Sequence, residues 1–476
     1  TALPAQKNVF VLNLSRMALG AEGAAVVAPA ACGLATLQTL DVSNNGLQSA
    51  GCSAFSQFLG SCRTLEVLDI GGNMIGSKGT KALMAALVQC TALQCLRIAG
   101  NGIGDEGAQA VAGMLSHAEK DPKGKRYVSL PIGMSLTELD VSRNGIGPVG
   151  CLAVCGVMHK LCERMRMLNL DSNNLTGSGS DMAGAKALGD ALMTMTRMEH
   201  LNLSHTTLGA EGGQFVANGL LEKERYLKRE VQRMWREVGA RIELSKEERR
   251  ELEELAEQKE QEMLSYSKSR SLQTLLLDGN MLSIDGMRLI GEMRGVFQGL
   301  RKLSIGSNDL TGNTYNFASE GALPMTNSLK AAKMITHLNI SDNGFNVGGD
   351  GAILNMVCQA LYGLQQLLHL DLSNNAVGYK GAGQLAGALN ALKHIQHLNL
   401  RSNGMQSEGV KTIVPAMRPS LRHIDLADND IGPDGVTAFT VAIPGLSSLT
   451  HIDLSSNHLM HAIGRAPSAH SSDDPE

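Results

Sequence analysis

The sequence predicts an α/β solenoid with the shape of a horseshoe, in which parallel strands line the concave face and helices cover the convex face. Two observations predict this fold class. The pattern L-x-x-L-x-L-x-x-N-x-V-G, as in LLHLDLSNNAVGYKG at residues 367–381, returns along nearly the whole chain, most often 28 residues apart. In each unit the L-x-L alternation is typical of a short strand, and a G-x-x-G string followed by alanines and leucines, as at residues 104–115, is typical of a returning helix.

The asparagine of this pattern marks the repeats, which resemble leucine-rich repeats. We count fourteen repeats, and twelve of them carry the asparagine. Their positions are Met17, Asn45, Asn73, Asn101, Asn144, Asn173, Thr206, Asn280, Asn308, Asn343, Asn375, Asn403, Asn429 and Asn457. Repeats of roughly 20 to 29 residues form one strand and one helix each and bury a core only by stacking. We therefore expect the asparagine side chains to bind backbone groups inside one continuous solenoid.

Over about four fifths of the chain this pattern resembles the ribonuclease-inhibitor-like subfamily of leucine-rich repeat proteins. Ran GTPase-activating protein, NOD-like receptor sensors and ciliary dynein-regulatory-complex subunits share that pattern. The resemblance implies long repeats with full helices on the outside, and by analogy a permanent part of a large assembly.

Composition and charge exclude several classes of function. The net charge of -4 over 476 residues gives no general attraction to nucleic acid or to acidic membranes. The longest apolar run, residues 24–37, is broken by Pro29 and Gly33 and fits a repeat helix better than a membrane span. We therefore expect neither nucleic-acid binding nor membrane insertion.

The nine cysteines predict a reduced intracellular protein. Their number is odd, and Cys62, Cys90 and Cys162 each stand three residues before the first apolar position of the next repeat. Cys151, Cys155 and Cys162 resemble a zinc site only superficially, because no fourth ligand is evident. Core packing is favoured over metal ligation or disulfide formation.

The chain divides into two runs of repeats separated by an insert. Repeats 1–7 occupy residues 1–221 and repeats 8–14 occupy residues 269–460, and a polar tail at 461–476 is predicted to be disordered. A basic loop at 117–134 carries Lys123, Lys125, Arg126 and Tyr127 and is either a solvated loop or a docking finger. The terminal strands lack capping units, so we expect further chain or partners to cover them.

Residues 222–268 are predicted to form a charged helical hairpin, of the coiled-coil kind. Its arms, residues 219–241 and 242–264, carry charges of about +3 and -5, and Ser245 with Glu248 forms a capping box between them. A single longer helix is the alternative. Tyr226, Trp235 and Tyr266 lie outside the repeat core, where aromatic residues either anchor partners or pack on the solenoid's flank.

The third position of each of the last five repeats is histidine, namely His337, His369, His397, His423 and His451. Because neighbouring parallel strands lie about 4.8 Å apart, these imidazoles should form a ladder on the concave face instead of a convergent catalytic cluster. Three interpretations remain open. The histidines are repeat consensus, or they form a surface whose charge changes near neutral pH, or adjacent pairs bind a metal ion.

We find no enzyme signature, no phosphate-binding glycine loop, and no pattern that calls for a cofactor or a small-molecule substrate. The predicted function is therefore a non-enzymatic scaffold for protein partners in a large intracellular, cytoplasmic assembly, ciliary and cytoskeletal complexes included. The predicted binding residues are the five histidines, the basic loop residues and the three aromatic residues of the insert. The alternative is a small-GTPase regulator similar to Ran GTPase-activating protein. A third possibility, the sensor half of a NOD-like receptor, would need a nucleotide-binding domain.

Overall fold

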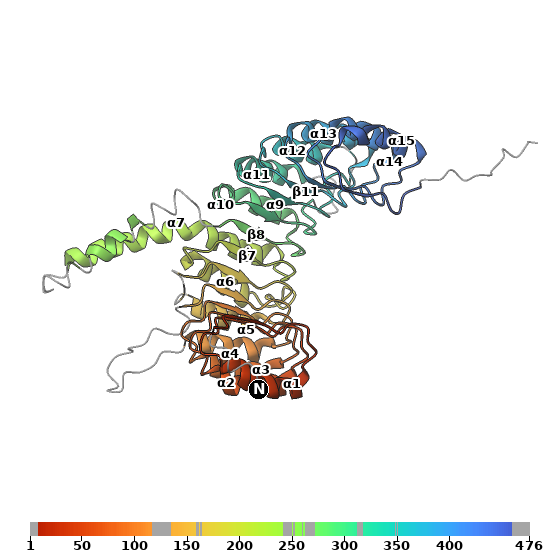
Figure 1. Cartoon of the computed structure of the whole chain (residues 1–476). Helices are drawn as coiled ribbons and strands as arrows, with labels where there is room; N and C mark the ends of the chain where they lie inside the picture. The colour runs from red at the N-terminus through yellow and green to blue at the C-terminus, as the bar shows by residue number, and fades with distance from the viewer. Residues whose placement is uncertain are drawn as a thin grey trace, which may run out of the picture.

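Short strands and helices alternate along a single solenoid (Figure 1). The computed structural model describes residues 8–116, 135–158, 161, 164–240, 250, 253–258, 260–261, 272–311, 318–347, 349 and 351–458. Each strand spans three residues. The strands are β1 (Val11–Asn13), β2 (Thr39–Asp41), β3 (Val67–Asp69), β4 (Cys95–Arg97), β5 (Glu138–Asp140), β6 (Met167–Asn169), β7 (His200–Asn202), β8 (Thr274–Leu276), β9 (Lys302–Ser304), β10 (His337–Asn339), β11 (His369–Asp371), β12 (His397–Asn399), β13 (His423–Asp425) and β14 (His451–Asp453).

The helices return the chain from one strand to the next on the convex side. They are α1 (Gly20–Cys32), α2 (Gln48–Leu59), α3 (Gly76–Leu87), α4 (Gly104–Ser116), α5 (Pro148–Val157), α6 (Ala183–Thr194), α7 (Gly209–Ala240), α9 (Ser283–Glu292), α10 (Arg294–Phe297), α11 (Ala318–Ala331), α12 (Ala352–Leu361), α13 (Gly378–Ala391), α14 (Gln406–Ile413) and α15 (Pro433–Ala442), with 3-10 turns η4 (Val414–Ala416) and η5 (Ile443–Gly445). The predicted helix at 104–115 corresponds to α4.

One fourteen-stranded parallel sheet runs through the whole solenoid in the order β1 to β14. The register is in step throughout, so that Leu40 pairs with Leu68, and Leu370 pairs with Leu398. The middle residue of nearly every strand is buried, because it points at the helices while its two neighbours face the concave side. The predicted fold class is confirmed.

The asparagine ladder connects successive turns. The Asn375 side chain donates from Nδ2 to the carbonyls of Ile340 and Leu372, both at 3.0 Å. Its Oδ1 accepts from the backbone N–H groups of Asn343 and Phe345 at 3.1 and 3.4 Å. Each ladder asparagine thus satisfies buried backbone groups that the tight turn after the strand leaves without partners.

The helix of repeat 7 continues into the insert without a break. The predicted start of the insert, residue 222, therefore falls inside α7, which spans 32 residues and projects away from the solenoid in Figure 1. The physical reason is that the segment after Gly219 is rich in leucine, glutamate, lysine and arginine, which all favour helix. Residues 253–258 and 260–261 of the second predicted arm are helical as well, whereas the turn between the arms lies outside the described residues.

Two glycines hold the first part of α7 against α6. A Cβ atom added at Gly219 would lie 2.2 Å from the backbone oxygen of Gly189, and one added at Gly189 would lie 2.4 Å from that of Phe215. Only glycine permits this approach. The direction in which α7 leaves the solenoid is therefore fixed by backbone packing at its base.

Candidate functional site

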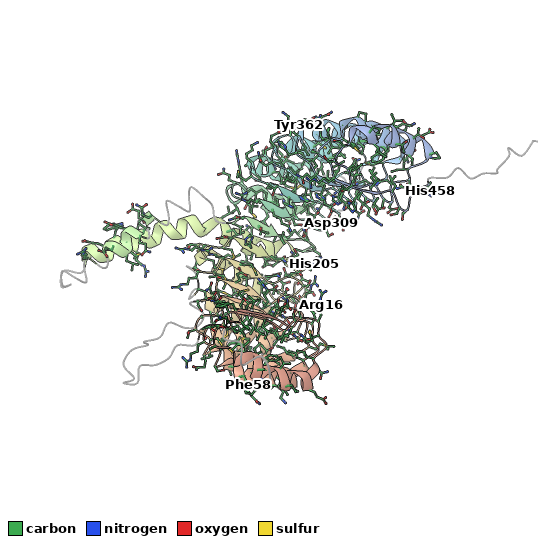
Figure 2. All side chains as sticks on the ribbon, in the orientation of Figure 1. Arg16, Phe58, His205, Asp309, Tyr362 and His458 are labelled. Carbon is green, nitrogen blue, oxygen red and sulfur yellow. The ribbon has the colours of Figure 1, made fainter. Side chains whose placement is uncertain are left out.

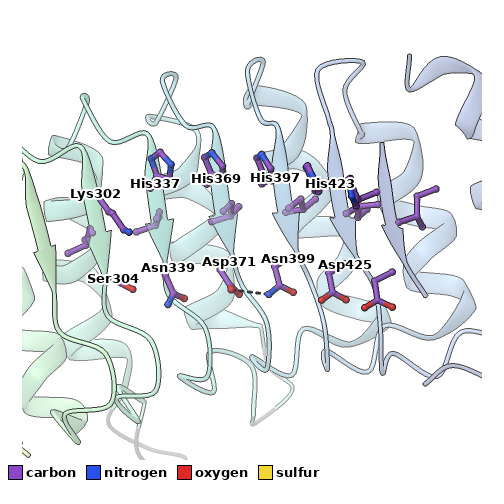
Figure 3. A pocket seen from close by; sticks show the side chains of 18 residues that line it. Lys302, Ser304, His337, Asn339, His369, Asp371, His397, Asn399, His423 and Asp425 are labelled. Atoms are coloured by element: carbon purple, nitrogen blue, oxygen red, sulfur yellow. Dashed lines mark hydrogen bonds between the residues drawn. The ribbon is translucent and has the colours of Figure 1, made fainter. Parts of the chain in front are cut away.

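The five predicted histidines lie in a row on the concave face of repeats 10 to 14 (Figure 3). Strand pairing places His337 beside His369, and the same register continues through His397, His423 and His451. Because each histidine is the first residue of its strand and the middle residue points into the core, every imidazole faces the concave side.

The imidazole rings are stacked. Neighbouring ring centroids are 4.0, 4.0, 4.2 and 4.2 Å apart from His337 to His451, and the planes of neighbouring rings differ by 10° to 16°. The expected ladder is thus confirmed, and we call these five residues the histidine ladder. His200, which occupies the same position in repeat 7, is separated from it by β8 and β9 and approaches Thr274 Oγ1 with its Nδ1 at 2.9 Å.

Burial and neighbouring positive charge lower the pKa of imidazoles in the ladder. Burial is the first cause at His369, where the pKa falls to about 4, and repulsion from neighbouring imidazoles and from Lys302 adds to it. The pKa of His337 is lowered by burial and then by Lys302, and that of His397 by burial and then by His423. These directions argue against a change of charge near neutral pH at these three residues.

A second row, of carboxylates and amides, runs beside the ladder two residues further along each strand (Figure 3). Asp371 accepts from the backbone and the side chain of Ser373 at 2.9 and 2.7 Å, and its other oxygen accepts from Asn399 Nδ2 at 2.9 Å. Asp425 and Asp453 each accept from the backbone N–H two residues later. We call Asn339, Asp371, Asn399, Asp425 and Asp453 the carboxylate row.

The two rows line one concave cavity of about 630 Å³, which spans β9 to β14. Lys302 and Ser304 of β9 form its first end, and His451 with Asp453 forms its last. The Nδ1 atom of His423 is buried and has no hydrogen-bond partner among the described residues. We call this cavity, with its two rows, the concave groove.

The geometry of the groove does not suit a metal ion. Parallel stacked rings direct their nitrogen lone pairs along parallel lines, whereas zinc requires ligands that converge on one point at about 2.0–2.1 Å. Within the part of the chain that the structure describes, no group of three or more histidine, cysteine, aspartate or glutamate side chains could hold a metal ion. General acid–base chemistry would likewise need convergent groups.

The other predicted binding residues lie far from the groove in sequence or outside the described residues. Trp235 lies on α7 and is 39% exposed, and Tyr226 lies on the same helix. Lys123, Lys125, Arg126, Tyr127 and Tyr266 fall outside the residues that the structure describes, as does the predicted tail at 461–476. The structure therefore brings the five histidines together and places the aromatic residues of α7 on a separate element.

The sequence analysis missed Lys302 and Asp278. Lys302 pairs with His337 across the sheet and is the positive charge at the first end of the groove. Asp278 accepts from Ser304 Oγ at 2.7 Å and from the Gly306 N–H at 2.6 Å. In other repeats the N–H equivalent to that of Gly306 donates to the residue equivalent to Ser304, such as Asp371. The sequence offered one signal for Asp278. Ser304 occupies the last strand position, at which most repeats carry aspartate or asparagine.

A family model described as Leucine Rich repeat matches eight segments of the chain. The segments are residues 33–56, 61–84, 89–112, 134–155, 195–217, 364–386, 391–414 and 419–439. Together with the continuous parallel sheet, these matches identify the chain as a leucine-rich repeat protein. Proteins of this class generally mediate protein–protein interactions and are typically scaffolds without enzymatic activity.

Several solved structures have a similar fold. An internalin (inlF) from Listeria monocytogenes is 15% identical, with 87% of this chain and 89% of that chain covered and a TM-score of 0.43. LegL7 from Legionella pneumophila is 15% identical, with 67% and 82% covered and a TM-score of 0.36. TLR13 in complex with ssRNA13 is 13% identical, with 96% and 62% covered and a TM-score of 0.33. A search of curated proteins found no match.

Within the described residues, no helix combines the length and the apolar character needed to cross a lipid bilayer.

Proposed function

We propose that this leucine-rich repeat protein is a non-enzymatic scaffold that binds a protein partner in the concave groove. The observation that carries the proposal is the unbroken stack of five imidazoles beside the carboxylate row, in a cavity of about 630 Å³. A flat array of stacked rings with hydrogen-bonding groups at a fixed spacing suits recognition of an extended surface, because each strand repeats the same contact.

We infer that α7 provides a second contact surface. The helix extends beyond the stack of repeat helices and carries Trp235, and exposed aromatic residues are frequent anchors in interfaces. Two separate surfaces support the proposal that the protein works within a multi-subunit assembly, for which the ribonuclease-inhibitor-like resemblance adds the analogy of cytoskeletal and ciliary complexes.

An intracellular location is supported by the cysteines. Seven cysteine side chains that the structure describes are buried, namely Cys52, Cys62, Cys90, Cys95, Cys151, Cys155 and Cys358. Burial raises the pKa of Cys52, Cys90, Cys95 and Cys358 to about 12, which keeps these thiols protonated and unreactive. Such cysteines fit a reducing compartment.

The test is a comparison of captured proteins. The full chain and the variant H369Q/H397Q/H423Q are immobilised and exposed to an extract of the source cells, and bound proteins are quantified by mass spectrometry. Glutamine keeps a polar side chain of similar length while it removes the stacked rings, and His200→Gln is the matched control at the same strand position in repeat 7. We expect proteins that bind the wild type and the control but not the triple variant. Equal capture by all three would contradict a binding role for the groove.

A further inference from the structure

The two edges of the concave groove carry opposite charge. We define two edges from the strands β9 to β14. For each strand, the amino edge is the five residues up to and including the first residue of the strand. The carboxyl edge is the six residues from the last residue of the strand onward. The amino edge contains five basic residues and no acidic ones, namely Arg301, Lys302, Lys333, Lys393 and Arg422. The carboxyl edge contains seven acidic residues and one basic residue, namely Asp309, Asp342, Asp371, Asp425, Asp428, Asp430 and Asp453 against Arg401.

This separation of charge belongs to the second half of the solenoid. Around β2 to β7, the amino-edge window holds four basic and four acidic residues, and the carboxyl-edge window holds two basic and four acidic residues. The leucine-rich repeat pattern therefore does not by itself produce the separation. Repeats 9 to 14 differ from repeats 2 to 7 in a property that the shared fold does not require.

The charges of the two halves also differ in their pairing. In the first half, ion pairs join edge residues of neighbouring repeats, as Arg97 does with Glu138 at 3.2 Å and Arg166 with Glu199 at 3.7 Å. In the second half, the five amino-edge cations and the seven carboxyl-edge carboxylates form no ion pair among the described residues except that of Asp430 with His458. Of these charged residues, Lys302, Asp371, Asp425 and Asp453 line the groove itself and are thus available to a partner.

The histidine ladder forms the inner limit of the amino edge. Burial lowers the pKa of His337, His369 and His397, which disfavours positive charge on these rings, and the ladder runs beside the carboxylate row in Figure 3. Figure 2 shows that Asp309 and His458, two carboxyl-edge residues, lie along the side of the solenoid that also carries Arg16 and His205. A partner lying across the strands would meet positive charge along one flank and negative charge along the other.

We propose that the concave groove binds an α-helix of a partner protein that carries acidic residues along one flank and basic residues along the other. The acidic flank lies against the amino edge and the basic flank against the carboxyl edge. This proposal rests on the proposed function and names the chemistry of the partner.

A helix fits the groove better than an extended segment does. A helix is about 10 to 12 Å wide, comparable to the roughly 10 Å that the three residue steps from Arg422 to Asp425 span along the strand. It also satisfies its own backbone hydrogen bonds, whereas an extended segment crossing the strands would leave its N–H and C=O groups without partners. The five strands of the ladder extend over roughly 19 Å, which about 13 helical residues would cover.

The test uses three end-capped, stapled helical peptides of about 15 residues, labelled with fluorescein. In the first, glutamates occupy one flank and lysines the other; the second has the same composition with both charges mixed on both flanks; the third has neutral flanks. Binding to the full chain is measured by fluorescence anisotropy at low and at physiological salt. We expect the segregated peptide to bind about tenfold more tightly than the other two, and its advantage to shrink with salt.

The matched variants are D371N/D425N/D453N in the groove and D41N/D140N at the same strand position in the first half. Asparagine is compatible with this position, because Asn339 and Asn399 already make the same bond to the backbone N–H two residues later. We expect the groove variant to lose most of the preference for the segregated peptide and the control variant to keep it.

Equal affinity for the segregated and mixed peptides would overturn the inferred charge preference, while groove-dependent capture of proteins would leave the proposed scaffold function intact. Self-association would also overturn the inference. In that case the mass of the protein in solution would increase with its concentration, and removal of residues 222–268 would abolish the increase. The charged insert of a second copy would then be the occupant of the groove.

Discussion

Asn375 joins three turns of the solenoid through one side chain. Its side-chain amide donates to three carbonyls and accepts from two N–H groups, and its own backbone N–H donates to Asn403 Oδ1 at 3.0 Å. The residue is fully buried. Removal of the amide would leave these groups without partners in a place that water does not reach.

We therefore expect Asn375→Ala to lower the free energy of unfolding by about 1 to 3 kcal/mol. Chemical denaturation followed by circular dichroism measures the change. Asn390→Ala is the control, because Asn390 is an exposed residue of α13 whose side chain makes no hydrogen bond within the described residues, and it should change stability little. An unaltered midpoint for Asn375→Ala would refute a structural role for the ladder.

The second prediction at this scale concerns the protonation of His369. Its pKa in the folded protein is lowered to about 4, whereas an unfolded histidine has the ordinary value of 6.5. Between these values the unfolded chain binds more protons, so stability falls as the pH falls from about 6.5 toward about 4 and is unaffected by this group above that window. Histidine ring signals in NMR spectra recorded against pH should place the His369 midpoint well below 6.5.

The matching stability measurement compares thermal unfolding at pH 7 and pH 5. His369→Gln should lose less stability on acidification than the wild type, because glutamine takes up no proton. His200→Gln serves as the control outside the ladder. A His369 midpoint at the ordinary value, together with equal acid sensitivity of the variant, would contradict the stacked and desolvated environment.

Helix α7 combines two roles in one element. Its first part packs on α6 through Gly189 and Gly219, as the other repeat helices pack on their neighbours, and its second part extends beyond the solenoid. Val231 is 7% exposed and Ala256, in the second arm, is fully buried, although both lie in the insert. Burial of apolar residues in both arms supports the proposal that the insert is a helical hairpin that packs on itself.

We predict that the insert contributes little to the stability of the solenoid. In the variant that joins Leu221 to Ser269 through a short Gly-Ser linker, repeats 7 and 8 should remain stacked, because β7 pairs with β8 and Asn280 binds the Leu203 carbonyl independently of the insert. Differential scanning calorimetry should show a similar melting temperature, while partners that bind the insert are lost. Aggregation of the variant would show that the insert covers part of the repeat core.

At the scale of the whole molecule, the ladder changes at the junction of repeats 7 and 8. Thr206 replaces the ladder asparagine in repeat 7, and its hydroxyl oxygen lies 2.6 Å from Leu203 O and 3.0 Å from Asn280 Oδ1, two acceptors that share its single proton. It offers no amide to the preceding turn, where the Leu175 N–H binds the Thr206 backbone carbonyl at 3.2 Å. Because each repeat contacts only its neighbours, one altered interface can divide the solenoid into two units.

We predict that the two halves open at different denaturant concentrations. Cys52 and Cys90 report on the first half and Cys358 on the second, and burial protects all three thiols in the folded protein. Brief alkylation at increasing urea, read by mass spectrometry, should give different midpoints for the two groups, with complete labelling at high urea as the control. One shared midpoint would show that the junction at Thr206 does not limit cooperativity.

The sequence alone determined the repeat architecture, the positions of the strands and the ladder of histidines. It could do so because the leucines at fixed spacing must be buried and a parallel stack places equivalent positions of successive repeats side by side. Once His369 and His397 share a repeat position, their proximity follows. The same reasoning explains why the asparagine ladder was predictable, since Asn375 and Asn403 recur at one place in each turn.

Only the tertiary structure decided the length of α7, the lowered pKa of His369 and the hydrogen bond that Asp278 accepts from the Gly306 N–H of the next repeat. These features depend on packing between segments that no local pattern connects, such as the approach of Gly219 to Gly189 and the desolvation of one imidazole by its neighbours. Periodicity fixes what every repeat shares. The departures that make this solenoid distinct are set by the contacts between particular repeats.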